Sequence, residues 1–302
     1  MKIVKWLGFG LAGLLAVLVA TLVGTRIVSE SKLGARFEVR PFAAPALPDD
    51  EAALAEGRRL FAARGCAECH GEDGGGRTVI DDPVLGRVAG ANITRGKGGL
   101  AAGFGDADFV RAVRHCVKPD GSAVRMMPCI ETRLVPDAEL AAILAHVKRL
   151  PPVDREITAI ELRPVGHALH AFGVLDLVHA AQIDFDAPIP AAPEPAPTAA
   201  YGERLAQIQC IGCHGEGLSG GPLPGAPPGL PVPSNITPDD ATGIGQWSQQ
   251  HFVQLLRTGR RPDGTAVDPF MPWQTYRHMN ETEIAALWAY LRSRPARPFG
   301  NR

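Results

Sequence analysis

The chain has 302 residues, which is enough for two domains of about 100–150 residues and their connections. Its 31 basic and 32 acidic residues nearly balance, so the sequence lacks the basic excess of a nucleic-acid-binding protein and predicts no nucleic-acid partner. Abundant glycine (34) and proline (27) predict many turns. Four of the six cysteines fall in two copies of one five-residue pattern.

The first element in chain order is an apolar segment. Residues 6–23 contain no charged side chain, while Lys2 and Lys5 precede them and Arg26 follows. At about 1.5 Å per residue this segment would cross a hydrocarbon core of about 30 Å, so residues 1–30 are predicted to be a retained transmembrane anchor. A cleaved signal peptide is the alternative, but its apolar part usually has about 7–15 residues. The two lysines predict a single-pass protein of a bacterial inner membrane, with its body in the periplasm.

The rest of the chain contains a duplication. The pattern Cys-x-x-Cys-His occurs at residues 66–70 and again 144 residues later, at 210–214. Asn-Ile-Thr at 92–94 recurs at 235–237, Pro-Asp-Gly at 119–121 recurs at 262–264, and Met-Pro at 127–128 recurs at 271–272. In each copy the histidine of the pattern precedes this methionine by 57 residues. These matches predict two copies of one domain, at residues 45–152 and 199–302.

Each copy is predicted to be helical. Apolar periodicity and end signals predict helices at residues 51–64, 106–117 and 136–150 in the first copy, and at 200–209, 247–257 and 281–294 in the second. Asp49 or Asp50 would cap the first of these helices. No segment alternates with period two over a useful length, so the predicted fold class is all-α with little sheet.

Residues 153–198 form the predicted connection between the copies. Residues 187–198 hold five prolines among alanines and predict an extended spacer, whereas 164–185 are more apolar and predict a strap that packs on one or both domains. The histidines of this strap, His167, His170 and His179, are interpreted as surface or interface residues. A metal site is the alternative, but no cysteine or carboxylate cluster accompanies them.

The Cys-x-x-Cys-His pattern is the haem-attachment motif of c-type cytochromes. Two thiols at this spacing can form thioethers with the two vinyl groups of one haem, and the adjacent histidine can bind the iron. A zinc or dithiol site is the alternative, but zinc needs further ligands and the second copy has no other cysteine. The sequence therefore predicts two covalent haem c cofactors, with His70 and His214 as iron ligands and these attachment cysteines: Cys66, Cys69, Cys210 and Cys213.

A distal iron ligand is predicted in each copy from the equal spacing of two methionines. Met271 lies in a loop between two predicted helices, and Met127 holds the matching place in the first copy. The repeat alignment and the following Pro128 favour Met127 over its neighbour Met126. Histidine and methionine ligation raises the reduction potential and closes the iron to external ligands, which suits electron transfer.

The two remaining cysteines, Cys116 and Cys129, flank the Met127 loop. Their repeat partners are Gly259 and Trp273, so both positions differ together, as expected for a disulfide in an oxidising compartment. Such a bridge would stabilise the fold by roughly 3 kcal/mol. The alternative is that Cys116, Cys129 or His115 binds the first haem iron.

The second copy resembles a known family. The sequences Asn-Ile-Thr-Pro at 235–238, Thr-Gly-Ile-Gly at 242–245, Trp-Ser at 247–248 and Met-Pro at 271–272 resemble the cytochrome c subunits of membrane-bound alcohol, aldehyde and gluconate dehydrogenases. This resemblance implies two tandem class I cytochrome c domains, with Asn92 and Asn235 near a haem propionate. Those subunits carry three haem motifs, whereas this chain has two. A diheme subunit of a haem-copper oxidase is less similar, because its motifs lie closer together.

These features predict a diheme c-type cytochrome that relays electrons between a dehydrogenase or quinol-oxidising complex and a soluble cytochrome or terminal oxidase. The expected partners are thus the membrane and redox proteins, and no catalytic residue is predicted. One alternative is a haem enzyme, such as a diheme peroxidase or a thiosulfate-oxidising cytochrome, with an unusual ligand at the first haem. A second alternative is a bridging subunit within a respiratory complex.

Overall fold

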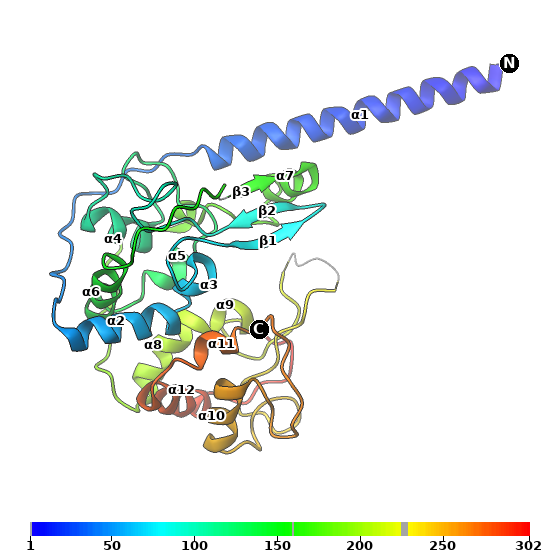
Figure 1. The fold of residues 1–302 in the computed structure, drawn as a ribbon. Coiled ribbons are helices and arrows are strands. Elements are labelled where there is room, and N and C mark those ends of the chain that lie inside the picture. The colour runs from blue at the N-terminus through cyan, green and yellow to red at the C-terminus, as the bar shows by residue number, and fades with distance from the viewer. Residues whose placement is uncertain (1, 159, 225–228) are drawn as a thin grey trace.

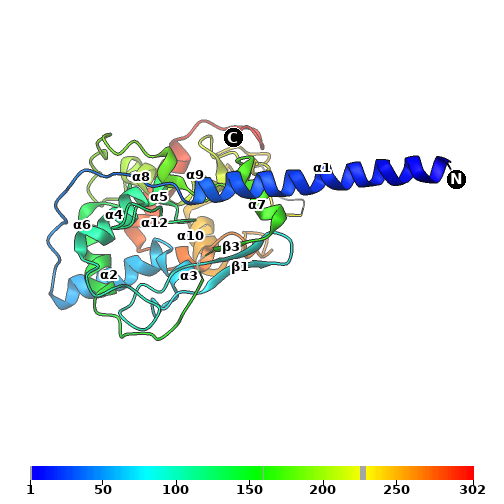
Figure 2. The same cartoon turned by 90° about the horizontal axis from the view of Figure 1, so that it is seen from above.

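The computed structural model describes residues 2–158, 160–224 and 229–302 of the chain. Two helical bodies lie next to each other, and one long helix projects from the first of them (Figure 1). We refer to residues 45–152 as module 1 and to residues 199–302 as module 2. The projecting helix, α1 (Lys2–Leu33), extends well beyond both modules in either view (Figure 2).

The C-terminal end of α1 is attached to the body of the protein. It lies along α7 (Pro164–Ala171), where His167 Nδ1 and Ser29 Oγ are 2.9 Å apart. The Lys32 ammonium donates to the carbonyl oxygen of Ala171 at 2.7 Å, and Leu33 is buried. By contrast, the large side chains that the structure describes in the apolar part of α1 are exposed.

Module 1 contains helices α2 (Glu51–Ala63), α3 (Cys66–His70), α4 (Asp106–His115), α5 (Cys129–Thr132) and α6 (Asp137–Val147). Asp50 caps α2 by accepting a hydrogen bond from the Ala53 amide at 2.9 Å, one of the two caps that the sequence allowed. Helices α2 and α6 cross and bury a core between them, including Leu60, Phe61 and Leu144.

Module 2 repeats this arrangement with α8 (Ala199–Gln209), α9 (Ile211–His214), α10 (Gln249–Thr258), α11 (Trp273–Tyr276) and α12 (Glu281–Ser293). Its core includes Tyr201, Leu205 and Ile284, where α8 crosses α12. The six predicted longer helices are confirmed, with ends that differ by up to three residues. The four short helices α3, α5, α9 and α11 have only four or five residues, which is too short for a periodicity signal.

Module 1 also carries a small antiparallel sheet, so the all-α prediction is incomplete. Strands β1 (Thr78–Asp82) and β2 (Gly86–Ala89) form a hairpin, and β3 (Ile160–Leu162) from the connecting segment pairs with β2. Asp82 stabilises the hairpin turn by accepting hydrogen bonds from the amides of Val84 and Leu85 at 2.7 Å each. The strands are three to five residues long, and β3 is remote in sequence, so alternation could not identify them.

The connecting segment packs on module 1, as one form of the strap prediction expected. After α7 it continues through a short 3₁₀ helix, η1 (His179–Gln182). Leu177, Val178 and Ala180 are buried in one cluster with Cys116 and Cys129. From here on we keep the name strap for residues 176–183 alone, the part of the predicted strap (164–185) that follows α7. Its histidine His179 and the α7 histidines His167 and His170 lie at interfaces rather than in a shared site.

The helix crossings depend on two equivalent glycines. A Cβ atom at Gly57 would overlap the carbonyl oxygen of Ala142, and one at Gly202 would overlap the carbonyl oxygen of Ala286. Any side chain at these positions would separate the helices that form each core.

We predict that Gly202→Ala lowers the free energy of unfolding of module 2 by about 1–3 kcal/mol, because the added methyl group forces α8 away from α12. Urea titration followed by circular dichroism measures this change. Gly103→Ala is the control, because a Cβ there meets no atom within 4 Å. Equal stability of the two variants would contradict the role of the crossing.

Candidate haem-binding sites

In module 2 the predicted haem ligands surround one cavity. Cys210 ends α8, and the turn of α9 places Cys213 and His214 on the same cavity wall. Met271, from the loop before α11, lines the cavity as well. The rest of the wall is mostly apolar, with Ile236, Trp247, Phe252, Leu256, Tyr276 and Leu287 among its residues. Two thiols, an imidazole and a thioether on one apolar cavity fit a covalently attached haem.

The backbone fixes the orientation of each motif histidine. His214 Nδ1 lies 2.7 Å from the carbonyl oxygen of Ser234, and His70 Nδ1 lies 2.8 Å from that of Ala91. A carbonyl oxygen only accepts, so Nδ1 carries the proton and Nε2 keeps its lone pair for a metal. Burial lowers the pKa of both imidazoles, which keeps them neutral.

The first cysteine of each motif is protonated at neutral pH. Burial raises the pKa of Cys66 to about 12 and that of Cys210 to about 12. Burial also raises the pKa of Cys69 and Cys213. The four side chains are therefore thiols rather than thiolates in the polypeptide before any attachment reaction.

Asn92 and Asn235 occupy equivalent, fully bonded positions. The Asn235 amide donates to Thr242 Oγ1 at 2.9 Å and to the Arg297 carbonyl oxygen at 2.7 Å, while its own oxygen accepts from the Thr237 amide. Asn92 makes a similar set of bonds in module 1, with the carbonyl oxygens of residues 153 and 155 as acceptors. Both side chains thus join the Asn-Ile-Thr loop to the chain after the last helix. The propionate contact stays a prediction.

The backbone identifies Met127, rather than Met126, as the structural equivalent of Met271. The Cys129 amide donates to the Met127 carbonyl oxygen at 2.8 Å, and the Trp273 amide donates to the Met271 carbonyl oxygen at 2.7 Å. The intervening prolines have nearly the same dihedral angles. Met126 instead has a left-handed backbone, with φ of 62°. Its amide donates to the Leu177 carbonyl oxygen of the strap at 3.0 Å.

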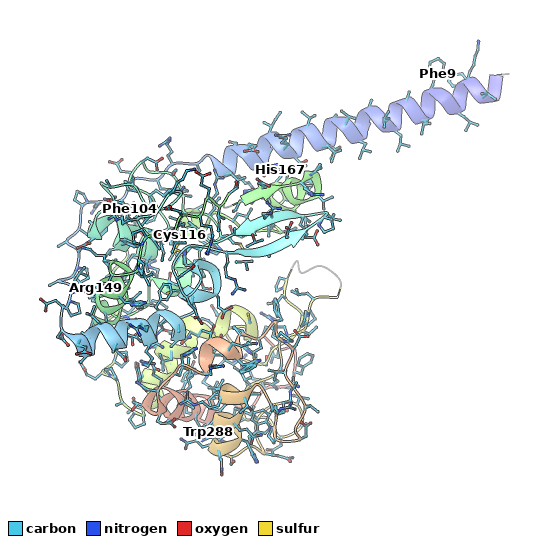
Figure 3. The ribbon with its side chains drawn as sticks, in the orientation of Figure 1. Phe9, Phe104, Cys116, Arg149, His167 and Trp288 are labelled. Atoms are coloured by element: carbon cyan, nitrogen blue, oxygen red, sulfur yellow. A yellow bond between two sulfur atoms is a disulfide. The ribbon has the colours of Figure 1, made fainter. Side chains whose placement is uncertain are left out.

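A disulfide joins Cys116 and Cys129 in the interior of module 1, with 5.7 Å between their Cα atoms. Figure 3 labels Cys116 at this position. The equivalent residues in module 2 also touch, because Gly259 lies directly against the indole ring of Trp273. Cys116 and Gly259 both end their helices with a left-handed backbone, at φ of 55° and 66°. The bridge therefore replaces a glycine–tryptophan contact.

The disulfide also removes two of the alternative iron ligands. Neither Cys116 nor Cys129 has a free thiol. The third alternative, His115, lies between the rings of Phe42 and Phe185, with centroid distances of 5.6 Å to each. Burial lowers the pKa of His115 to about 4. His115 is thus a neutral interior side chain that contacts the strap side of module 1.

The strap covers the Met127 loop, a contact that sequence reasoning missed. His179 Nδ1 lies 2.7 Å from the Met127 carbonyl oxygen, and the Met126 amide binds the strap backbone. In module 2 the residues before Met271 are exposed, and Phe270 keeps 44% of its surface accessible. The equal sequence spacing of the two methionines gave no sign of this difference. The available signal was His179, the last of the three histidines in this apolar segment.

The modules meet in a buried ion cluster. The Arg64 guanidinium donates to Glu283 Oε1 of module 2 at 2.6 Å and to both carboxylate oxygens of Glu139 at 2.8 Å. Arg59 adds a second bond to Glu283 at 2.7 Å. The side chains of Arg64 and Glu283 are only 1% and 2% exposed. Ile208 of α8 is buried in the hydrophobic core of module 1, so a side chain of module 2 completes that core.

Each Cys-x-x-Cys-His turn lies against the short helix of the other module. Glu68, between Cys66 and Cys69, accepts a hydrogen bond from Thr275 of α11 at 2.8 Å. In the reciprocal contact, a Cβ at Gly212 would lie 3.4 Å from Glu131 Oε1 of α5. The two motifs therefore face the same interface, and each is next to the helix that follows the other module's methionine.

Comparisons with known proteins agree with this geometry. Residues 199–295 match the family model for cytochrome c, and residues 52–147 match the model for cytochrome c oxidase, cbb3-type, subunit III. The spacing of the two haem motifs had favoured the dehydrogenase subunits over a diheme oxidase subunit. The second match nevertheless gives module 1 alone a likeness to an oxidase subunit.

Individual relatives match about a third of the chain. The cytochrome c subunit of a quinone-dependent alcohol dehydrogenase of Gluconobacter oxydans is 36% identical over 94 residues, 30% of this chain and 20% of that protein. The cytochrome subunit of a fructose dehydrogenase of Gluconobacter japonicus is 34% identical over 112 residues, 34% of this chain and 23% of that protein. A diheme cytochrome c-type protein of Cereibacter sphaeroides is 34% identical over 107 residues, 32% and 36% of the two chains. All these matches thus span well under two thirds of the relatives.

The chain contains two cytochrome c domains and carries two covalently bound haem c groups. It resembles the cytochrome c subunits of alcohol and gluconate dehydrogenases, as the sequence motifs indicated, and also that of a fructose dehydrogenase.

We predict that Cys116→Gly/Cys129→Ser is more stable than Cys116→Ala/Cys129→Ser by about 1 kcal/mol, because alanine is strained where glycine is not at positive φ. Both variants lose roughly 3 kcal/mol relative to the wild type, because the disulfide is absent. Urea unfolding under non-reducing conditions measures both differences. An alanine variant as stable as the glycine variant would contradict the left-handed cap at Cys116.

Proposed function

We propose that this protein is a membrane-anchored electron carrier whose two haems pass electrons to each other across the interface between the modules. The observation that carries the proposal is the reciprocal packing of each haem motif on the other module's short helix. Bound haem supplies one-electron redox chemistry at its iron. The polypeptide supplies attachment, axial ligands and a fixed arrangement of the two sites.

The residue assignments extend the geometry of module 2, where the candidate groups line one cavity, to the equivalent residues of module 1. The thiols of Cys66 and Cys69 in module 1, and of Cys210 and Cys213 in module 2, would hold the haems by adding their S–H bonds across the two vinyl groups of each haem. Nε2 of His70 and of His214 binds iron, because Nδ1 is held by a backbone carbonyl. Met127 and Met271 would supply the second protein ligand of each iron and would keep water from it.

The arrangement favours direct transfer between haems. The Tyr276 hydroxyl, on the wall of the second haem cavity, donates to the Gln209 carbonyl oxygen at 2.7 Å. The side-chain Nε2 of Gln209 in turn donates to the carbonyl oxygen of Ala63, three residues before Cys66. A continuous set of partly buried hydrogen bonds thus links the second haem cavity with the chain just before the first attachment site.

The N-terminal helix supports a location at the membrane. In the described part of the chain, α1 alone is long and apolar enough to cross a bilayer, and its apolar stretch is exposed rather than packed in the body of the protein. We propose that it is a retained single-pass anchor of a bacterial inner membrane, with both haem domains in the periplasm. The contacts of Leu33 and Lys32 would hold module 1 next to the membrane surface.

The proposed partners are redox proteins. The relatives named as dehydrogenase cytochrome subunits suggest a dehydrogenase or quinol-oxidising complex as the electron donor. A soluble cytochrome or a terminal oxidase would accept the electrons, and the match of module 1 to an oxidase subunit model fits that direction.

A haem enzyme with an open first haem fits less well. Such catalysis needs an accessible iron, whereas the disulfide and the strap both hold the Met127 loop in place. The described residues of module 2 include neither restraint, so any opening would begin at the second haem.

We predict that Met127→Leu and Met271→Leu each remove about half of the sulfur-to-iron absorption of the oxidised protein and lower the potential of one haem, because each removes one thioether ligand. The visible spectrum and a potentiometric titration measure these changes. Met126→Leu is the matched control and leaves both haems unchanged. Loss of the absorption in Met126→Leu, with none in Met127→Leu, would contradict the assignment.

We predict that imidazole replaces the methionine of the second haem at lower concentration than that of the first, because only the Met127 loop is held by the strap. His179→Ala should make the first haem easier to open by about five- to tenfold, the equivalent of one hydrogen bond. Optical titration of the oxidised protein measures both binding steps.

Gln182→Ala is the control for this experiment, because it alters the strap at a residue that binds Asp176 rather than the loop. A first haem that opens more easily than the second in the wild type would contradict the role of the strap.

A further inference from the structure

A groove runs along one side of the interface between the modules. Its module 1 wall comes from α2, the α3 turn and the end of α6, and its module 2 wall comes from α11 and the residues just after it. Arg149, labelled in Figure 3, lies on the module 1 wall beside the end of α6. The groove is separate from the cavity that holds the second haem.

Positive charge dominates the groove. Four exposed arginines line it, and none has a carboxylate within 4 Å in the described part of the chain: Arg58, Arg77, Arg149 and Arg277. Arg59 is also present, but Glu56 and Glu283 neutralise it. The opposing charges in the groove are Glu68 and Glu72, of which Glu68 is bound by Thr275. This concentration contrasts with the formal net charge of −1 for the whole chain.

The groove reaches the first haem attachment site. Ala67 and Glu68, the two residues between Cys66 and Cys69, form part of its wall. Arg77 is held beside Cys69, because its amide donates to the Cys69 carbonyl oxygen at 3.1 Å. A protein seated in the groove would therefore touch the turn that carries the thioethers of the first haem.

We propose that this groove is the docking site for the acidic face of a soluble one-electron redox protein, and that electrons pass there to or from the first haem. The inference rests on the electron-carrier function and adds the charge of the partner and the place where it binds. The four arginines are exposed and spread over both walls of an open groove, which suits a broad protein surface rather than a small buried anion. Opposite charges would steer the encounter and speed association at low salt.

Arg77→Glu/Arg277→Glu tests the proposal, because it reverses one charge on each wall. The reduced, detergent-solubilised full-length protein is mixed in a stopped-flow instrument with an oxidised acidic blue-copper protein, and in parallel with a basic cytochrome c. For the acidic acceptor, the variant should lower the second-order rate constant about tenfold at low ionic strength. The difference should nearly disappear in high salt, where charges are screened.

The control is Arg40→Glu/Arg87→Glu, which makes the same change of net charge at exposed positions outside the groove. It should leave the rate constant close to that of the wild type. Arg58→Glu/Arg149→Glu provides a second groove variant, and unchanged haem spectra and midpoint potentials verify that each variant is intact.

Equal losses in the groove and control variants would overturn the proposal, as would a wild-type preference for the basic acceptor. Inhibition by micromolar citrate, too dilute to alter ionic strength, would assign the groove to a small anion instead. Failure of the wild type to transfer electrons to either protein would contradict the electron-carrier function itself, which distinguishes the two failures.

Discussion

The arrangement of the two haem sites depends on the buried ion cluster of Arg64, Glu139 and Glu283. Burial alone would raise the pKa of Glu283, but Arg64 and Arg59 outweigh it and hold that pKa below its usual value. Both partners are thus charged in a place that excludes water, where removal of one charge costs about 3–5 kcal/mol. The ion pairs of Arg64 with Glu139 and Glu283 form together in one relative position of the modules, so they fix how the modules face each other.

A fixed interface gives the duplication a functional meaning. Because each motif turn contacts the short helix of the other module, the two haem attachment sites face one interface, and the proposed transfer between the haems needs no motion of either module. The modules then differ at their outer parts. The first packs against the apolar helix α1, the sheet and the strap and contains the disulfide, and the second has an exposed methionine loop. The first copy has thus gained a disulfide and the covering strap, while the described part of the second copy keeps a simpler form of the domain.

Local patterns predicted the helices and the haem motifs, because both depend on residues close together in sequence. The pairing of Cys116 with Cys129 was predicted because both positions differ from their repeat partners. The comparison of repeats also predicted Met127, and the backbone hydrogen bonds now show its equivalence to Met271. The β3 strand and the contact between the strap and the Met127 loop could not be predicted, since the segments that meet there lie about 50–80 residues apart in sequence. The ion cluster was equally hidden, because Glu283 reads in sequence as an ordinary residue in the first turn of α12.

The most direct test of the account is to inject one electron into the oxidised protein with a flash of a photoreductant and to follow the absorbance of the two haems. We predict that the electron redistributes between them in a first-order step whose rate constant does not depend on protein concentration. Equilibration only through collisions, at a rate that rises with protein concentration, would contradict a relay built on the interface between the modules.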